Sequence, residues 1–138
     1  TQPRQLIADG VLQRYVLSSY SARRLNLETT GNAGGVHNLI VAPTVDSLGE
    51  LLGAHPRLFL VSELLGQGVN TVTGDYSRGA AGFLVENGEI GHPVHEVTIA
   101  GNLADMFKRI EAIGADIDRR GSICSGSVLV DELTIAGA

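Results

Sequence analysis

The sequence has no tryptophan, one cysteine and only 4% aromatic residues among its 138 positions. A core built on large aromatic rings is therefore excluded, and buried surface must come from Leu, Ile, Val and Ala. A single cysteine excludes an internal disulfide, which suits a reducing compartment. No apolar stretch approaches the ~20 residues that a membrane helix needs, so we expect no membrane partner.

Positive charge is also scarce. Ten Lys and Arg stand against fifteen Asp and Glu, for a net charge of -5, and the cations form no run. Proteins that follow a phosphate backbone concentrate cations on one surface, so we expect no direct nucleic-acid partner. Hydrophobic residues make up 43% of the chain and charged residues 18%. This balance predicts a folded chain, and its length fits a single domain over residues 1–138.

Two-residue turn signals predict hairpins. Asn87-Gly88 follows the strand-like run Ala80–Val85, and Asn-Gly is a strong hairpin signal because both residues tolerate positive φ. Asp9-Gly10 predicts a first, shorter hairpin in the same way. Near the end of the sequence, Ser127–Val130 and Leu133–Ala136 are interpreted as a last pair of strands.

The clearest predicted helix begins after Asn102. Five apolar residues follow at helical spacing and form one stripe: Leu103, Met106, Phe107, Ile110 and Ile113. Gly114 is a plausible left-handed cap, and Tyr20–Leu25 and Ser47–Leu52 are shorter helix candidates. The fold class we predict is α+β, with a mixed, mostly antiparallel sheet of short hairpin-linked strands and two or three short helices.

A polar cluster precedes the central hairpin. Asp75, Tyr76, Ser77 and Arg78 lie between two glycines and next to an apolar run, which is typical of a contact loop. The alternative is a capped surface turn in which Asp75 bonds its own backbone.

Metal-binding and nucleophilic residues form no complete motif. His92 and His95 are three positions apart, so on a strand their side chains point to opposite faces and do not share an ion. His55 precedes a proline and is expected on a loop. Cys124 is open to three interpretations: a nucleophile, a metal ligand whose partners lie elsewhere, or a partly buried free thiol. We assign no catalytic residue and no metal ligand to this segment, with Cys124 as the alternative ligand.

Several stretches together resemble the PmbA (TldE) branch of the TldD/PmbA family. They occur in the family's order and are distributed along most of the chain: Ser19–Arg23, Thr30–Gly31 with Ala33–Gly35, Gln67–Asn70, Thr73–Phe83, Val85–Ile90, Val97–Leu103 and Gly126–Leu129. The resemblance implies the C-terminal part of a longer protein. The absence of a starting Met and the strand-like residues after Pro3 agree with a missing N-terminal part.

The resemblance also implies a function. Family members form a cytoplasmic two-subunit peptidase, in which the TldD-type subunit carries zinc on a His-Glu-x-x-x-His helix and a cysteine. The PmbA-type subunit lacks that helix motif and pairs with the catalytic one, and unfolded peptides are thought to reach the site along a sheet edge. The family's older label, modulator of DNA gyrase, implies an indirect effect, in agreement with the acidic charge.

One departure concerns the cysteine. PmbA relatives usually read Cys-Gly-Ser-Val-Leu near the end, whereas this chain reads Cys124-Ser125-Gly126 before Ser127. Aligning the glycine places Ser125 at the usual cysteine position, which weakens any transfer of a zinc-ligand role to Cys124.

Three hypotheses result. The first is a non-catalytic domain that supplies sheet scaffold, subunit interface and part of a peptide-binding cleft. Its partners are a TldD-like catalytic subunit or a second copy in a homodimer, together with unfolded peptide, and Asp75, Tyr76, Ser77 and Arg78 are the contact residues. The second is part of an active zinc peptidase in which Cys124 completes a metal site. The third is a purely structural dimerisation module.

Overall fold

The computed structural model describes residues 3–137, which form two compact units, Thr1–Leu39 and Ile40–Ala138. Each unit is described by itself. None of the helices in the described range is long and apolar enough to cross a membrane.

The first unit contains the predicted short hairpin and a one-turn helix. Strands β1 (Ile7–Ala8) and β2 (Val11–Leu12) pair antiparallel around Asp9-Gly10, where both φ angles are positive, at 49° and 74°. Helix α1 (Ser19–Arg24) begins after Ser18, whose hydroxyl accepts from the Ser21 N–H while the Ser21 side chain bonds back. This capping box fixes the start of the helix, which is present within one residue of the predicted range Tyr20–Leu25.

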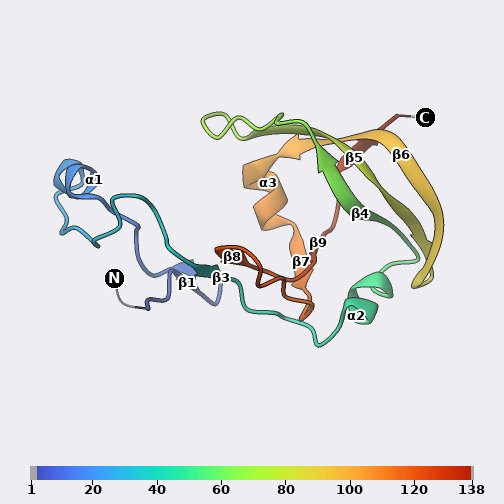
Figure 1. Ribbon diagram of the computed structural model, residues 1–138, viewed down its shortest axis with the longest axis horizontal. Coiled ribbons are helices and arrows are strands. Elements are labelled where there is room, and N and C mark those ends of the chain that lie inside the picture. The colour runs from blue at the N-terminus through green and yellow to red at the C-terminus, as the bar shows by residue number, and fades with distance from the viewer. Residues whose placement is uncertain (1–2, 138) are drawn as a thin grey trace. The chain divides into compact units, whose positions relative to one another are not determined.

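A four-stranded antiparallel sheet dominates the second unit (Figure 1). Its strand order is β10 (Thr134–Ala136), β6 (Glu89–Asn102), β5 (Asp75–Glu86) and β4 (Arg57–Leu65). The central hairpin turns at Asn87 and Gly88 with φ angles of 51° and 84°, as the Asn-Gly signal predicted. The fold class is therefore confirmed as α+β with mostly antiparallel sheet, although β5 and β6 are longer than expected.

Register shifts bend these long strands without ending them. The second arm was expected to bend or end near Pro93, but β6 continues past it, with Phe83 opposite Pro93 and shifts on either side. Glu96 adopts a positive φ of 57° beside one shift, the local distortion by which a bulge absorbs an extra residue. A further shift between Val61 and Glu63 lets β4 run on to Leu65.

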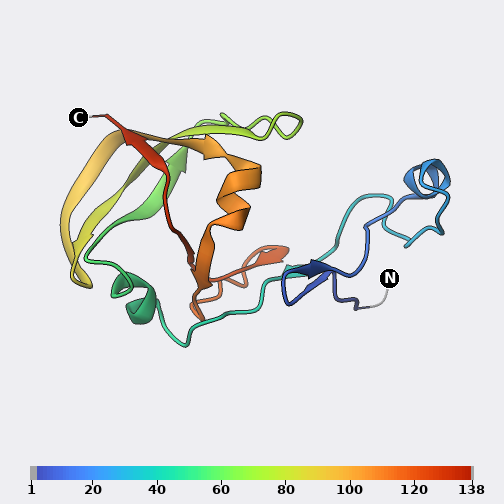
Figure 2. The same cartoon turned by 180° about the vertical axis from the view of Figure 1, so that it is seen from behind.

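The buried core of this sheet lies on one face. Ala80, Val97 and Ile99 are buried together, and four partly buried residues pack against them: Phe59, Val61, Tyr76 and Val94. Helix α3 (Leu103–Lys108) lies on the concave side of the sheet (Figure 2). A Cβ at Gly101 would lie 3.4 Å from Cγ of Met106, so the start of α3 packs back on the end of β6.

The predicted helix after Asn102 is shorter than its apolar stripe suggested. Asn102 caps α3 as expected, but the helix ends at Lys108, and Ile110–Ile113 form strand β7. Ile110 and Ile113 pair with strand β9 (Val128–Val130). Both are β-branched and suit a strand, but their three-residue spacing alone does not distinguish a strand from a helix. Gly114 is consequently not a helix cap.

The predicted last strand pair was also wrong. Strand β9 pairs with β7, whereas β10 pairs with β6, so each of the two terminal strands has a partner far away in sequence. The remaining elements are short. Helix α2 (Leu48–Leu52) is capped by Ser47 and lies at the tip of the β5–β6 hairpin. Strand β3 (Leu39–Ile40) spans the boundary between the units. Strand β8 is Ile123–Cys124.

Candidate functional site

The polar cluster predicted as a contact loop forms the beginning of a strand. Asp75, Tyr76, Ser77 and Arg78 are the first four residues of β5 and pair with β6. On the other side, Ser77 N–H donates to Gly68 O at 2.7 Å and Asp75 O accepts from Asn70 N–H at 2.8 Å. The loop assignment was wrong, because the preceding segment folds back and completes the pairing of these residues.

The four side chains divide between the two faces of the sheet. Tyr76 and Arg78 are half-buried on the core face, and Tyr76 packs against the buried cluster, whereas Asp75 and Ser77 are exposed on the other face. This division follows from strand alternation. The cluster therefore offers two pairs of side chains, one to each face.

Arg78 has an unusual environment for a cation. Its Nε atom is buried and meets no hydrogen-bond acceptor among the described residues, while its Nη2 donates to Leu64 O at 3.5 Å, a long contact. A buried guanidinium N–H without an acceptor is unfavourable. Arg78 thus lies beside the last residues of β4 with hydrogen-bonding capacity left over.

Asp75 takes part in a local turn. Its carboxylate accepts from the Thr73 hydroxyl at 2.6 Å, and Asn70 Oδ1 accepts from the N–H groups of Val72 and Thr73. A capped turn is therefore present before β5, but Asn70 caps it; the Asp75 carboxylate bonds the Thr73 side chain and not its own backbone, which the alternative had proposed.

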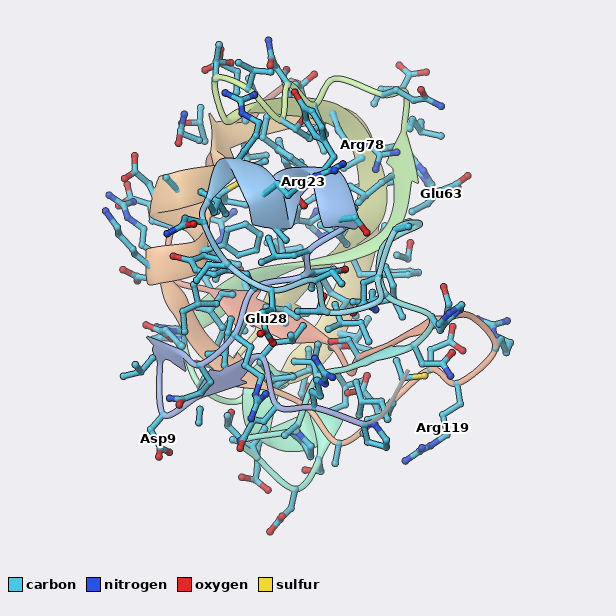
Figure 3. All side chains as sticks on the ribbon, turned by 90° about the vertical axis from the view of Figure 1, so that its left-hand side faces the viewer. Asp9, Arg23, Glu28, Glu63, Arg78 and Arg119 are labelled. Atoms are coloured by element: carbon cyan, nitrogen blue, oxygen red, sulfur yellow. The ribbon has the colours of Figure 1, made fainter. Side chains whose placement is uncertain are left out.

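Strand β4 forms one edge of the four-stranded sheet. It pairs only with β5 within the described part of the chain, and its residues from Ser62 to Leu65 are exposed. Leu64 and Leu65 are 39% and 49% exposed. Figure 3 shows Glu63 pointing outward from this edge, with Arg78 at the same end of the strand. An edge of this kind presents unpaired main-chain N–H and C=O groups.

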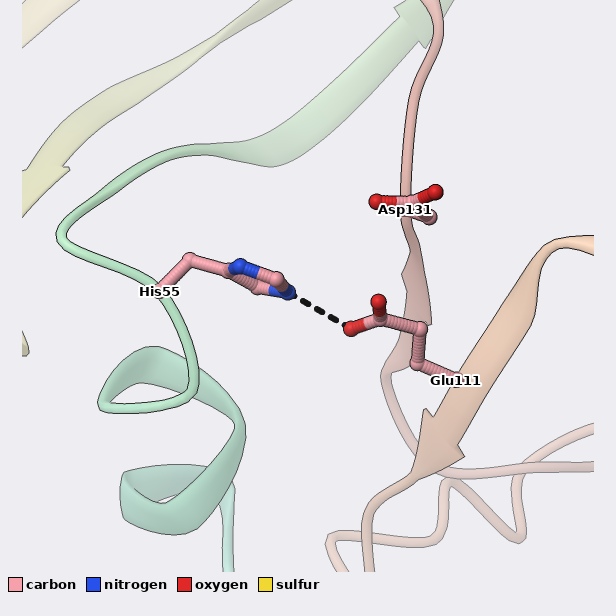
Figure 4. A group of neighbouring side chains, drawn as sticks. All are labelled: His55, Glu111 and Asp131. Carbon is pink, nitrogen blue, oxygen red and sulfur yellow. Dashed lines mark hydrogen bonds and ion pairs between the residues drawn. The ribbon is translucent and has the colours of Figure 1, made fainter.

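A second cluster joins three segments of the same unit (Figure 4). His55 lies between α2 and β4, Glu111 on β7, and Asp131 directly after β9, and one ligand atom of each lies within 4.8 Å of the others. His55 Nε2 is 2.6 Å from Glu111 Oε2. This hydrogen bond and the charge of Glu111 raise the pKa of His55 above its ordinary value, and Asp131 adds to the effect.

The sequence reasoning missed this second cluster. His55 and Glu111 are 56 positions apart, and neither carries a local motif. Glu111 is the extra residue of a register shift between Ile110 and Ala112 in the β7–β9 pair. Such a bulge redirects a side chain, but its position depends on long-range pairing. His55 does lie in a non-strand, non-helical segment, as expected.

Cys124 lies on β8 and is half-buried. Its Sγ is 3.7 Å from Gly121 O and belongs to no group of three or more candidate ligands among the described residues. His92 and His95 are both exposed on β6. The chain contains no His-Glu-x-x-x-His sequence, so its residues do not fit the zinc-ligand set that the family resemblance implies.

Comparison with known proteins gives a consistent result. The family described as PmbA/TldA metallopeptidase C-terminal domain matches residues 1–137. The chain belongs to the PmbA/TldD family. It is 53% identical to Metalloprotease PmbA of Escherichia coli O157:H7 and 50% identical to a Metalloprotease PmbA homolog of Haemophilus influenzae, each over 99% of this chain.

A solved PmbA/TldD-like structure supports the fold as well. A Thermotoga maritima protein, described as a candidate modulator of a DNA gyrase, superposes with a TM-score of 0.85 at 36% identity over 95% of this chain. The chain spans 30% and 31% of the two curated relatives and 32% of the solved chain. The matched family model describes the C-terminal domain of PmbA/TldA metallopeptidases, and the chain corresponds to that domain.

Proposed function

We propose that this domain is a non-catalytic part of a PmbA/TldE-like subunit in a cytoplasmic TldD/TldE-type metallopeptidase complex. It supplies sheet scaffold, a subunit interface and one wall of a peptide-binding cleft. Its partners are a TldD-like catalytic subunit, or a second copy in a homodimer, and unfolded peptide.

The observation that carries this proposal is the free edge of β4. An extended peptide adds to such an edge through main-chain hydrogen bonds, which select little for sequence. The exposed Leu64 and Leu65 would contact alternate side chains of the added strand. By contrast, the main chain of Asp75–Ser77 is paired on both sides, so this segment offers only side-chain contacts.

Arg78 extends the same surface. Its Nη2 already approaches Leu64 O at the exposed end of β4, and its Nε lacks an acceptor among the described residues. Because Nε is buried in this conformation, a peptide carbonyl or a carboxylate from the partner subunit would bond the guanidinium after the side chain turns outward, and a hydrogen bond to a charged group contributes roughly 1.5–3 kcal/mol. Tyr76 holds the neighbouring position on this face.

The hydrolytic chemistry belongs to the partner in this proposal. The chain lacks the family's His-Glu-x-x-x-His sequence, and Cys124 belongs to no group of three or more candidate ligands among the described residues. Zinc is accordingly expected on the TldD-type subunit, which would activate the water that attacks the peptide bond.

The experiment uses the full-length protein with its TldD-type partner. Arg78→Ala and Tyr76→Phe are compared with wild type for subunit affinity and for cleavage of an unfolded peptide. The matched control is Arg57→Ala, since Arg57 is an exposed arginine at the opposite end of β4. Arg78→Ala is expected to weaken pairing or raise the peptide KM by roughly tenfold, which corresponds to about 1.4 kcal/mol, while the control leaves both unchanged.

Unchanged pairing and cleavage in both Arg78→Ala and Tyr76→Phe would reject the assignment of this contact surface. The structural dimerisation module makes a different prediction. In that case the two variants change the affinity between subunits, but a photo-cross-linkable peptide does not attach to β4 in wild type or in either variant.

A further inference from the structure

We propose that His55, Glu111 and Asp131 form a binding site for a divalent transition-metal ion such as Zn²⁺, separate from the family's catalytic zinc. This site goes beyond the proposed peptide-binding role. It involves neither Cys124 nor a paired-histidine helix.

The first argument is convergence. The three ligand atoms come from the turn before β4, from β7 and from the residue after β9, yet all lie within 4.8 Å of one another. Figure 4 shows His55 and Glu111 directed at each other, with Asp131 on the adjoining segment. Neighbouring ligands of a four-coordinate zinc with bonds of about 2.0–2.2 Å are roughly 3.3–3.5 Å apart. The present spacing requires only side-chain adjustment, because Glu111 and Asp131 are exposed and His55 is half-buried.

The second argument is charge. Two carboxylates, those of Glu111 and Asp131, share one imidazole, whose single positive charge when protonated balances only one of them. The Asp131 carboxylate makes no hydrogen bond or ion pair to any described residue, although its own N–H is held by Arg109 O at 2.9 Å. The neighbouring carboxylate, Glu132, pairs instead with Arg109 at 3.3 Å. A divalent cation would compensate the charge that remains.

The third argument is backbone placement. Glu111 is the additional residue in the register shift that separates Ile110 from Ala112 on β7. A regular strand pair has no such unpaired residue. The bulge takes the Glu111 side chain out of the regular alternation and directs it toward His55. The Asp131 main chain is fixed at the end of β9 by the bond from its N–H to Arg109 O, two residues before Glu111 of the partner strand.

The donor set decides the class of ion. One imidazole nitrogen with two carboxylate oxygens suits Zn²⁺, Mn²⁺ or Fe²⁺, whereas Mg²⁺ and Ca²⁺ favour oxygen-only sites. Three protein ligands leave a position for water, so the affinity should be lower than that of a closed four-ligand site. A bound ion would fasten the entry of edge strand β4 to the β7–β9 pair.

The test measures Zn²⁺ stoichiometry of the full-length protein by equilibrium dialysis and elemental analysis, with the visible absorption of Co²⁺ as an independent readout. His55→Ala and Asp131→Asn remove ligands. His92→Ala and Glu132→Gln are the matched controls, because both are exposed and stand outside the cluster. We expect wild type and controls to bind one equivalent that the two ligand variants lose or hold at least roughly tenfold more weakly, by analogy with the loss of supporting residues at metal sites.

Zn²⁺ should also raise the melting temperature of wild type and controls, as a ligand of the folded state does, and should not do so in His55→Ala. Circular dichroism is used to check that the exposed Asp131→Asn variant is folded. Equal zinc content in all variants, no zinc in wild type, or loss of zinc only in Cys124→Ala would each overturn the proposal.

Discussion

Gly82 allows a sharp test of how closely β4 and β5 approach each other. It is buried opposite Val61, where the register of the pair shifts. A Cβ atom at this position would overlap the carbonyl oxygen of Leu60 and lie 2.9 Å from its carbonyl carbon and 3.0 Å from Cα of Val61. These are backbone atoms, so no side-chain rotation relieves the overlap. Gly82→Ala must displace the edge strand.

The expected cost lies at the upper end of the range for overpacking, about 3 kcal/mol in the free energy of unfolding. With about 2–4 °C per kcal/mol for a domain of about this size, the melting temperature should fall by roughly 6–12 °C. Gly49→Ala is the matched control. Its Cβ would meet only Ser47 Oγ at 3.6 Å within helix α2, where Ala is favoured over Gly by up to about 1 kcal/mol.

Thermal unfolding of the full-length protein measures the global effect, and hydrogen–deuterium exchange of β4 amides measures the local one. Gly82→Ala should speed exchange along β4, because a displaced strand pairs less well with β5. If Gly82→Ala melts and exchanges like Gly49→Ala, then the close approach of the two backbones does not hold the edge strand in place, and the reasoning from this contact fails.

Three further predictions follow from other hydrogen bonds and turns. The Ser127 hydroxyl and N–H lower the pKa of Asp116, so the stability that this carboxylate contributes is complete above its unfolded pKa of about 3.9 and is lost as pH falls through the lower folded value. Ser127→Ala should therefore lower the melting temperature at pH 6, with the difference from wild type shrinking below about pH 4. Asn102→Ala removes the cap to Ala104 N–H and the bond to Thr73 O, and should cost about 1–2 kcal/mol in chemical denaturation. Gly88→Ala places a side chain at a φ of 84° and should cost about 1 kcal/mol, whereas an equal midpoint would show that this turn tolerates a Cβ.

Local chemistry explains which parts of the fold could be predicted. Asp9-Gly10 and Asn87-Gly88 determine their turns through backbone preferences of two adjacent residues, and both appear with positive φ angles. Ser18 and Asn102 likewise cap the helices that follow them. Each of these predictions required no knowledge of distant residues.

Long-range pairing explains what could not be predicted. Ile110 and Ile113 fit a helical stripe, but β9 recruits them into a strand, and β10 pairs with β6 instead of its neighbour in sequence. The same limit applies to the candidate sites. Resemblance and polar composition singled out Asp75–Arg78, but only the pairing with β6 shows which of these side chains face the core. His55, Glu111 and Asp131 meet only after three separate segments have assembled.

The open edge of β4 has a further consequence, for self-association of the protein. An unpaired strand edge is suited to pairing with the same edge of a second copy. The exposed side chains of Leu64 and Leu65 would add apolar contacts to such fibre-like assembly. Glu63 is the acidic residue beside them. In a parallel, in-register pairing of two copies, Glu63 would lie beside its own counterpart, and the like-charge repulsion would oppose polymerisation along this edge.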